Sequence, residues 1–555
     1  TRLLFQTDTV TIGAIQVLGS RATNDVRANY SRNSGSNVYS IDSFGGAVPL
    51  NDDAIFPPFA SSQDSLFGFS LSDQVVFFVG SNARNYQRQI NVVDNLALAK
   101  NNHQFKFGFD FRHLAPILDT SRYFQQASFR GVPGALTGIA AGVQVSGKSG
   151  KATTSVNNFS AYAQDTWRIG NRLTFSYGLR WEYNPPASIT TENPPLLATG
   201  IENPPTIHLA PPGSSWTTSS SNLAPRFGIA YRLSDEPGKE LVVRGGFGVF
   251  FDTAGGMAGS VLGGTMSSAT LIFNTPFPLS LVQATPPSPS NPVPPYSLIT
   301  AFDGDLDPPR TYQWNVALEQ SLSLKQTVTA AYVGAAGRSL LRRERYFRPN
   351  PEFINVNAFT DAATSDYHAL QVQYQRRLSH GLQSLASYTW SHSIDISSNE
   401  TSLTLPGVTA DPRLDRASSD FDVRHSFSAG LTYDIPKTLP HGFLDRVTRN
   451  WSVDVLFRSR TATAVNILTG TRLFGVFNVL RPDLISGVPQ YLEDPTVAGG
   501  RRINAAAFST PAPNRQGNLG RNALRGFSAT QLDLGLHRRF ALNERFAVQF
   551  RAEFF

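Results

Sequence analysis

The stretch that decides the fold is RLTFSYGLRWEYNPP, residues Arg172–Pro186. Every second position from Leu173 to Tyr183 is apolar or aromatic, and the positions between them are threonine, serine, glycine, Arg180 and Glu182. Alternation with a period of two places successive side chains on opposite faces of a β-strand. The pattern lasts about ten residues and stops at a proline pair. The sequence therefore predicts a long strand with one aromatic face and one polar face.

The same alternation recurs along the chain. It is clearest at 103–113, 241–252, 425–434, 451–460 and 545–555. Strands of roughly 9–11 residues have the length that crosses a bilayer at a tilt, whereas soluble strands are usually nearer 5–6 residues. The whole sequence contains about 16–18 segments of this kind.

The connections between these segments alternate in length. Short polar turns fall at 99–104, 168–173, 234–240, 323–327, 378–382 and 541–545. Long stretches rich in Pro, Gly and Ser fall at 113–156, 184–222, 252–310, 335–366, 392–424 and 461–528. This pattern predicts an all-β fold, a transmembrane antiparallel up-and-down β-barrel with short periplasmic turns and long extracellular loops. In lipid such a sheet must close so that every backbone amide is paired, with its aromatic face toward lipid and its polar face toward a lumen.

Composition narrows the function classes. The chain has no cysteine, a net charge of +7 and 11% aromatic residues, and its apolar share is 41%. Only seven of its 48 basic residues are lysines. The arginines indicate either a GC-rich genome or contact with anions, namely lipid phosphates or acidic solutes. They are spread along the chain without a basic tract, so we expect no nucleic-acid partner.

Two sets of side chains follow from the strand pattern. On the polar faces, Arg180, Glu182, Arg244 and Asp454 are predicted to line the lumen. Tryptophans of the strands are predicted to form the interfacial aromatic girdles, and these are Trp167, Trp181, Trp314, Trp390 and Trp451.

Motifs for chemistry are weak. The nine histidines show no metal-ligand spacing and no serine lies in a nucleophile elbow, so we predict no catalytic site, no cofactor and no enzyme activity. Asp303, Asp305 and Asp307 are a weak calcium candidate, but they lack the downstream glutamate of an EF-hand loop, and a solvated turn is the favoured interpretation. The Asp- and Arg-rich segment 411–425 is expected to form a salt-bridged network at the barrel rim.

Several stretches resemble the barrel of TonB-dependent outer-membrane receptors of the Oar-like, acidobacterial type. They include NNFSAYAQDTWRIGNRLTFSYGLRWEYNPP (157–186), NLAPRFGIAYRL (222–233), ALQVQYQRRLSHGLQSLASYTWSHSID (369–395) and SSDFDVRHSFSAGLTYDIP (418–436). The resemblance covers most of the chain from about residue 90 onward. It implies a 22-stranded barrel, an N-terminal plug with a TonB box, and often a carboxypeptidase-regulatory-like domain. We expect residues 1–555 to be one barrel domain, truncated at both ends, without the plug or the regulatory-like domain.

The resemblance also implies a location and partners. The location would be the outer membrane of a Gram-negative bacterium, with lipid and lipopolysaccharide around a monomeric barrel. TonB would act through the missing plug to energise uptake of an extracellular solute too large for porins, such as an iron chelate, an oligosaccharide or a peptide. A passive porin, a surface adhesin without transport, and a soluble β protein remain alternatives.

Overall fold

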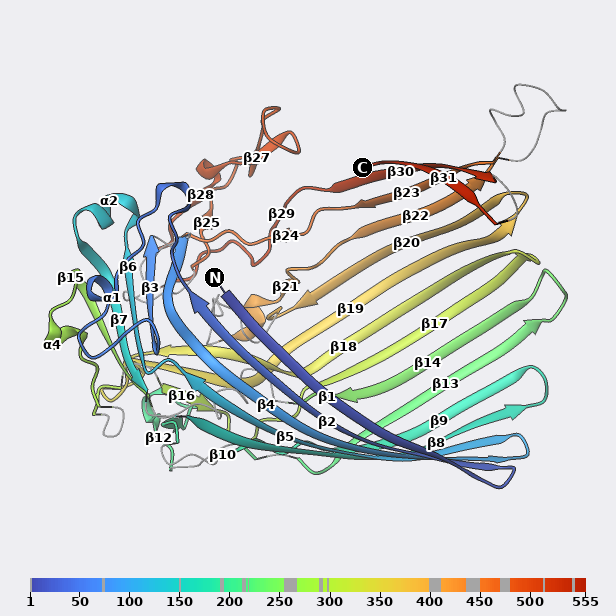
Figure 1. Ribbon diagram of the computed structural model, residues 1–555, viewed down its shortest axis with the longest axis horizontal. Helices are drawn as coiled ribbons and strands as arrows, with labels where there is room; N and C mark the ends of the chain where they lie inside the picture. The colour runs from blue at the N-terminus through green and yellow to red at the C-terminus, as the bar shows by residue number, and fades with distance from the viewer. Residues whose placement is uncertain are drawn as a thin grey trace.

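The computed structural model describes residues 2–71, 75–148, 151–189, 194–211, 216–217, 219–253, 267–288, 293–296, 299–398, 411–435, 450–469, 480–512, 515–541 and 545–555. A curved ladder of long antiparallel strands dominates it, and each strand pairs with the next along this ladder (Figure 1). In the described residues the ladder has sixteen members, which are β1 (Arg2–Leu18), β2 (Ala22–Tyr39), β4 (Val75–Lys100), β5 (His103–Thr120), β8 (Ala152–Ile169), β9 (Leu173–Tyr183), β13 (Asn222–Ser234), β14 (Leu241–Phe251), β17 (Arg310–Ser323), β18 (Gln326–Phe347), β19 (Asn355–Ser379), β20 (Leu382–Asp395), β22 (His425–Asp434), β23 (Trp451–Arg460), β30 (Ala529–Ala541) and β31 (Ala547–Phe554).

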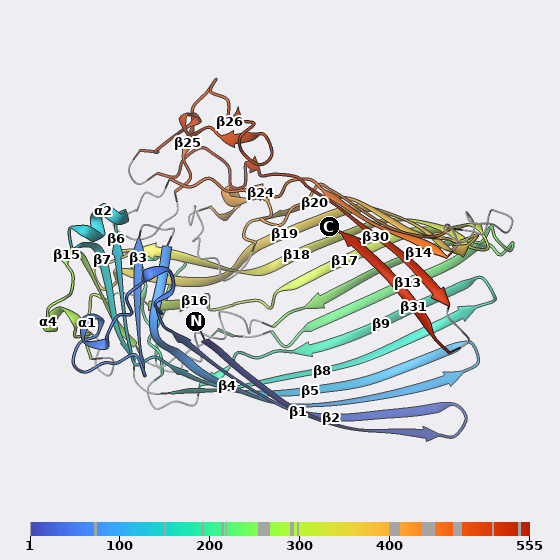
Figure 2. The same ribbon diagram turned by 45° about the horizontal axis from the view of Figure 1, so that its top comes forward.

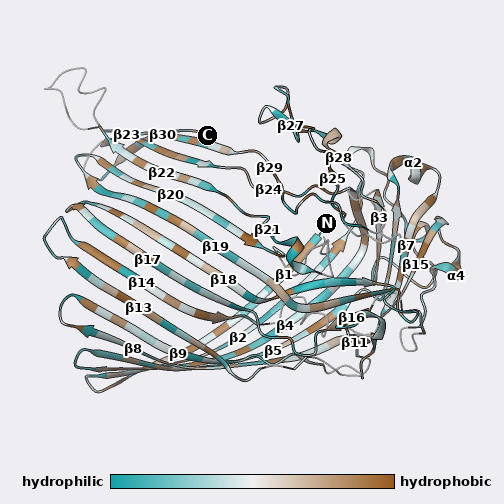
Figure 3. Ribbon diagram, turned by 180° about the vertical axis from the view of Figure 1, so that it is seen from behind, coloured by the Kyte–Doolittle hydropathy of each residue, from teal (hydrophilic) through white to brown (hydrophobic). Residues whose placement is uncertain are grey.

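The predicted alternation is preserved in the register of the paired strands, because residues of the same face stand opposite one another. β9 pairs with β8 and β13 so that Tyr177 stands opposite Asp165 and Phe227, and Leu179 stands opposite Ala163. Leu179 on this face is 46% exposed, so the apolar face has no protein layer over it there. Figure 3 shows apolar and polar residues alternating along the strands of the wall. A sheet that exposes its apolar side is the arrangement expected in lipid.

Short turns lie together at one end of the ladder, as the sequence predicts (Figure 1). The turn between β19 and β20 uses His380 and Gly381, both with positive φ, of 52° and 77°. A Cβ on Gly381 would stand 2.3 Å from the Asp434 carbonyl oxygen, so only glycine fits this close approach. The strand ends at the opposite end of the ladder carry the longer connections.

The long connections are more structured than the sequence indicates. Beyond the wall, β4 also pairs with β3 (Ser65–Leu71), which runs parallel to β6 (Tyr123–Phe129). β6 pairs with β7 (Ile139–Lys148), and β7 pairs with β15 (Ser267–Pro276). We call these four strands the outer sheet. The short helices α1 (Asp52–Ile55), α2 (Gly131–Leu136) and α4 (Leu281–Ala284) lie beside it (Figure 1).

The outer sheet has its own apolar core. Phe67, Phe129 and Val143 are each at most 2% exposed, and Tyr123 is 4% exposed. The Tyr123 hydroxyl donates to the carbonyl oxygen of Ala284 at 3.0 Å, which ties α4 to β6. Burial raises the pKa of this hydroxyl, because the charged form would lose its hydration.

A second packed region lies over the far end of β19. There β16 (Ile299–Phe302) runs parallel to both β19 and β11 (Leu197–Thr199), and β11 pairs with β12 (His208–Leu209). Phe353 and Val356 are buried within it. Trp216, the one tryptophan outside the predicted strands, is also buried here and lies 4.9 Å from the Phe302 ring, centroid to centroid.

The connection between β23 and β30 folds over the last part of the wall (Figure 2). Its described parts contain three two-stranded pairings, β24 (Ala464–Val465) with β29 (Leu524–Arg525), β25 (Asp483–Leu484) with β28 (Phe508–Ser509), and β26 (Tyr491–Glu493) with β27 (Arg501–Ile503). Two further short strands extend the wall, β10 (Ser188–Ile189) beside β8 and β21 (Ala417–Ser418) beside β20. Among the described residues, no helix has both the length and the apolarity to cross a membrane.

Candidate functional site: the inner wall and the extracellular rim

The polar face of the wall carries paired charges. The Arg180 Nε lies 2.8 Å from Glu182, and the Arg244 guanidinium lies 3.3 Å from Glu319 on the next strand. Asp454 accepts from the Thr432 hydroxyl at 2.7 Å. The strand pairings place these side chains on the face opposite the exposed aromatics. Their role in lining a lumen stays a prediction.

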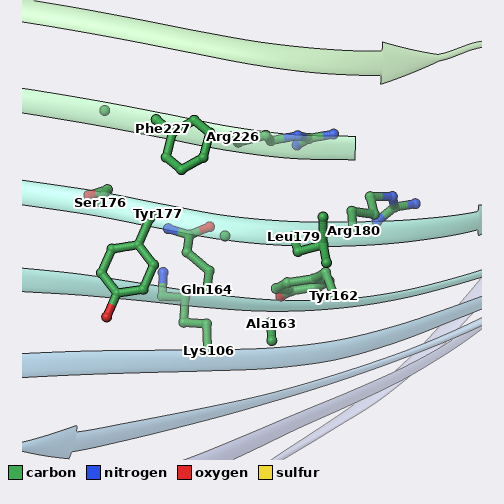
Figure 4. A pocket seen from close by; sticks show the side chains of 12 residues that line it. Lys106, Tyr162, Ala163, Gln164, Ser176, Tyr177, Leu179, Arg180, Arg226 and Phe227 are labelled. Atoms are coloured by element: carbon green, nitrogen blue, oxygen red, sulfur yellow. The ribbon is translucent and has the colours of Figure 1, made fainter. Parts of the chain in front are cut away.

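A shallow groove of about 430 Å³ crosses this polar face (Figure 4). Its lining comes from β5, β8, β9 and β13 and includes the cations Lys106, Arg180 and Arg226. Gly178 and Gly228 form part of its floor, so no side chain stands in the way of a backbone or solute there. The Arg226 guanidinium lies 4.4 Å from the centre of the Phe250 ring. The groove can hold polar or anionic groups against the wall.

The five strand tryptophans share the exposed face but lie at different heights. Trp167 lies near the short turns and stacks on His103, while Trp451 is the first residue of β23 and also lies at that end. Trp181 donates from its indole nitrogen to the Ser220 carbonyl at 2.7 Å, toward the other end of the wall. Trp390 is 54% exposed beside the start of β22.

The position of the Trp314 ring depends on Gly334 of the neighbouring strand. A Cβ on Gly334 would stand 2.2 Å from the indole, so the ring lies flat over a position where only glycine leaves room. The tryptophans thus occupy both ends of the wall and positions between them. Their assignment to the membrane interfaces stays a prediction.

The three spaced aspartates have protein partners. Asp305 accepts from the Thr217 hydroxyl at 2.9 Å, and Asp307 pairs with Arg310 at 3.6 Å. Asp303 accepts from the backbone N–H of Asp305 at 3.4 Å, which is a local turn contact. No group of three potential metal ligands occurs in the part of the chain that the structure describes. The aspartates thus have turn and ion-pair contacts in the structure, and a calcium site at them stays an untested prediction.

Segment 411–425 forms the salt-bridged network expected at the rim, and Asp415 lies at its centre. One Asp415 oxygen lies 3.0 Å from Arg342 of β18, and the other lies 2.6 Å from Arg481. The Arg342 side chain is fully buried and also lies 3.3 Å from Glu344. A buried carboxylate with two guanidiniums is stable only because each charge has close partners.

Two further arginines complete the network from the 480–527 connection. Arg521 pairs with Asp395 at the end of β20 and donates to the Asp415 carbonyl oxygen at 2.9 Å. Arg525 pairs with Asp422 at 2.7 Å, and the Asp422 side chain is fully buried. We call Arg342, Glu344, Asp395, Asp415, Asp422, Arg481, Arg521 and Arg525 the rim network. It fastens the 480–527 connection to two strands of the wall, β18 and β20, and to segment 411–425.

Burial shifts the ionisation of the network's β18 members. Burial lowers the pKa of Arg342, although Glu344 and Asp415 oppose this change. The same burial raises the pKa of Glu344, against the attraction of Arg342. Both directions are those expected where burial removes water and ion pairs take its place. Outside the rim network but on the same strand, the pKa of Arg345 falls to about 10, because it is buried and lies near Arg343.

Sequence reasoning found one half of the rim network and missed the other. The Asp and Arg residues of 411–425 are dense enough to stand out, but Arg481, Arg521 and Arg525 lie in a segment without strand periodicity. Their partners are roughly 65–125 residues away in sequence. No local pattern signals such contacts, and only the excess of isolated arginines in 480–527 hints at them.

In the described part of the chain, long strands expose apolar faces and the folded connections gather at one end of the wall. These features define an integral outer-membrane β-barrel protein. The chain belongs to the outer membrane beta-barrel domain family, because the sequence model of that family matches residues 2–555. The resemblance seen in the sequence and the predicted fold class are thereby confirmed. The protein lies in the outer membrane of a Gram-negative bacterium.

Solved structures support the fold. The outer membrane transporter YddB from Escherichia coli is 10% identical, with a TM-score of 0.54, over 96% of this chain and 56% of that chain. The siderophore receptor PiuA from Acinetobacter baumannii is 11% identical, with a TM-score of 0.51, over 99% of this chain and 60% of that chain. The chain therefore spans little more than half the length of these proteins. No curated protein matches the sequence.

Proposed function

We propose that this chain is the wall of a TonB-dependent receptor that takes up an extracellular solute too large for porins. The full-length protein would carry a plug domain inside the barrel, and TonB would remodel that plug. The groove of the inner wall would contact the plug and the passing solute. The solute would be an iron chelate, an oligosaccharide or a peptide.

One observation carries this proposal over a passive porin. Within the described residues, sixteen wall strands leave β1 and β31 with one partner each. A sixteen-stranded porin would pair its first and last strands, because an open edge in lipid leaves backbone groups unpaired. The open ladder therefore favours a wall with more strands, in which residues 1–555 form a part of the barrel.

The extracellular side supports the same proposal. The outer sheet and the rim network are folded elements with buried cores and ion pairs, which can present a fixed surface to a solute. No residue of the described chain needs to do chemistry in this scheme, because energy would come through TonB.

The test uses the full-length protein and needs no knowledge of the solute. We would measure its binding to the purified periplasmic domain of TonB, together with its single-channel conductance in planar bilayers. Binding to TonB with a closed channel supports the proposal. A steady ohmic conductance with no binding to TonB would replace it with the porin, and a closed channel without TonB binding would favour the adhesin.

A further inference from the structure

A band of basic side chains crosses the exposed face of the wall near its extracellular end. It consists of Arg310 on β17, Arg338 on β18, His368 on β19, Arg416 before β21, and Arg424 and His425 at the start of β22. Arg310 stands directly opposite Arg338 on the neighbouring strand. His392 of β20 stands opposite His368 and accepts a hydrogen bond from Arg424 at 2.9 Å. With His392, the basic band is therefore continuous over five wall strands, β17 to β20 and β22.

The basic band lies on the apolar side of the wall. Just below it, Tyr332, Leu370 and Trp390 face one another on β18, β19 and β20. Each of these three is at least 40% exposed. His368 lies two residues before Leu370 and therefore shares its face. The same face that offers aromatic residues to lipid thus turns basic at its upper end.

The height of the basic band matches the edge of a bilayer. His392 and Arg424 each lie about ten residues along their strands from the short turns, and Arg338 lies about twelve residues along. A tilted strand of roughly 9–11 residues crosses the hydrocarbon core. The basic band is therefore level with the headgroups of the outer leaflet, and aromatic rings lie beneath it as at a membrane interface.

Charge within the basic band is only partly compensated, because its four arginines face three aspartates. Arg310 lies 3.6 Å from Asp307. Asp366 forms ion pairs with two arginines, Arg338 at 2.8 Å and Arg416 at 2.5 Å. Arg424 lies 3.5 Å from Asp422, which has a shorter bond to Arg525. The side chains of Arg338, Arg416 and Arg424 are 40%, 38% and 39% exposed, so an external anion can reach each of them.

The strands β9, β13 and β14 are apolar on the exposed face at the same height. β9 ends on Tyr183, β13 has Leu223 there, and β14 ends on Phe251. A second basic group, Arg32, Arg88 and His113, stands on β2, β4 and β5. The basic band of β17–β22 is thus the larger of two basic regions, separated by strands that are apolar at this height.

We propose that the basic band binds the phosphate groups of lipopolysaccharide in the outer leaflet. Guanidiniums hold phosphate oxygens through paired, charge-assisted hydrogen bonds, and the exposed rings below would pack against acyl chains. The proposal rests on the outer-membrane location and does not depend on solute transport.

The experiment measures binding of purified lipid A to the full-length protein in detergent by native mass spectrometry. The probes are diphosphorylated lipid A and the same lipid without phosphates. We expect the triple variant Arg338→Gln, Arg416→Gln, Arg424→Gln to bind diphosphorylated lipid A about tenfold or more weakly. Arg172→Gln, at a short turn on the periplasmic side, removes a charge elsewhere and should bind as the wild type does.

A second variant keeps the test decisive if the triple variant folds poorly. Asp366→Asn removes the carboxylate that occupies two arginines, so binding should become a few-fold tighter. A role in structure alone would not produce this gain. The proposal is overturned if Asp366→Asn weakens binding or if phosphate-free lipid A binds equally well. It is also overturned if millimolar inorganic phosphate displaces the lipid completely, because the site would then bind free anions.

Discussion

Two extracellular regions of this barrel are held in place by different interactions, apolar packing in one and ion pairs in the other. The outer sheet encloses Phe67, Phe129 and Val143 in a dry core and stacks Phe67 on Phe277 with centroids 5.9 Å apart. The rim network holds the 480–527 connection with ion pairs, among which Arg342, Asp415 and Asp422 are equally buried. Both regions build a fixed surface above the wall, one from apolar area and the other from paired charge.

The difference lies in what each region tolerates. An apolar core loses stability in proportion to the volume removed, and it responds little to pH or salt. A buried ion pair gains little over an apolar pair of the same volume, but it costs much when one partner is lost. The outer sheet should therefore fail gradually under truncation, and the rim network should fail when a single charge is left alone.

The largest expected effect comes from emptying the core of the outer sheet. Phe67→Ala should cost the outer sheet about 3–5 kcal/mol of local stability, because the fully buried ring leaves a cavity. Hydrogen exchange of the β3 and β6 amides would report the loss. The exposed Phe44→Ala serves as the control, and unchanged exchange in β3 would contradict the assigned core.

Removing one charge of the rim network should cost slightly less. Arg342→Ala leaves Glu344 without its cation, but Asp415 keeps Arg481, so we expect about 3 kcal/mol, the low end for a broken buried pair. Exchange should rise in 411–425 and not in the outer sheet. Arg413→Ala, which breaks an exposed pair with Asp411, should change exchange very little.

Low pH should destabilise the 480–527 connection and leave the outer sheet stable, without any mutation. Hydrogen bonds from Arg515 and the Asn518 backbone hold the pKa of Asp483 below its ordinary value. A carboxyl with a depressed folded pKa stabilises the fold above its unfolded pKa of about 4, and this contribution is lost as pH falls through the folded value. Exchange in 483–518, corrected for intrinsic rates, should rise below about pH 4 while β3 and β6 stay protected. Asp483→Asn should abolish this pH step, and an identical step in the mutant would refute its origin.

Salt should give the smallest effect. At about 1 M salt the screening length is roughly 3 Å, so exposed pairs such as Arg502–Asp494 lose most of their attraction, a few tenths of a kcal/mol each. Exchange in 491–503 should rise slightly. The buried Arg342–Asp415 pair is out of reach of the ions and should not respond, and a loss of protection in 411–425 at high salt would show that water enters the rim network.

The wall was predictable because its information is local. Alternation from Leu173 to Tyr183 identifies a strand, its faces and its length within one segment. The turns between wall strands are equally local, as with His380 and Gly381. These features determine a meander without knowledge of any distant contact.

The extracellular regions were not predictable in the same way. β3 and β6 have the same residue types as wall strands, but they pair in parallel across more than fifty residues of chain. The rim network needs Arg521 to find Asp395 over a still longer separation. Pairings of this kind depend on the finished wall, which brings the strand ends together.

Register shifts lie at both ends of the wall strands. Some are beside the short turns, at Arg232–Ser234, Ser321–Ser323 and Arg376–Ser379, and others are where the wall meets the extracellular elements. β18 and β19 slip against each other between Gly337 and Arg342, and β2 slips against β4 at Asn37 and Val38. Below these bulges, gaining or losing one residue would turn the lipid face inward along the rest of the strand. At the bulges a single residue can be absorbed. Extracellular segments of such barrels can therefore change in length one residue at a time during evolution, while insertions in the membrane-crossing part are confined to pairs.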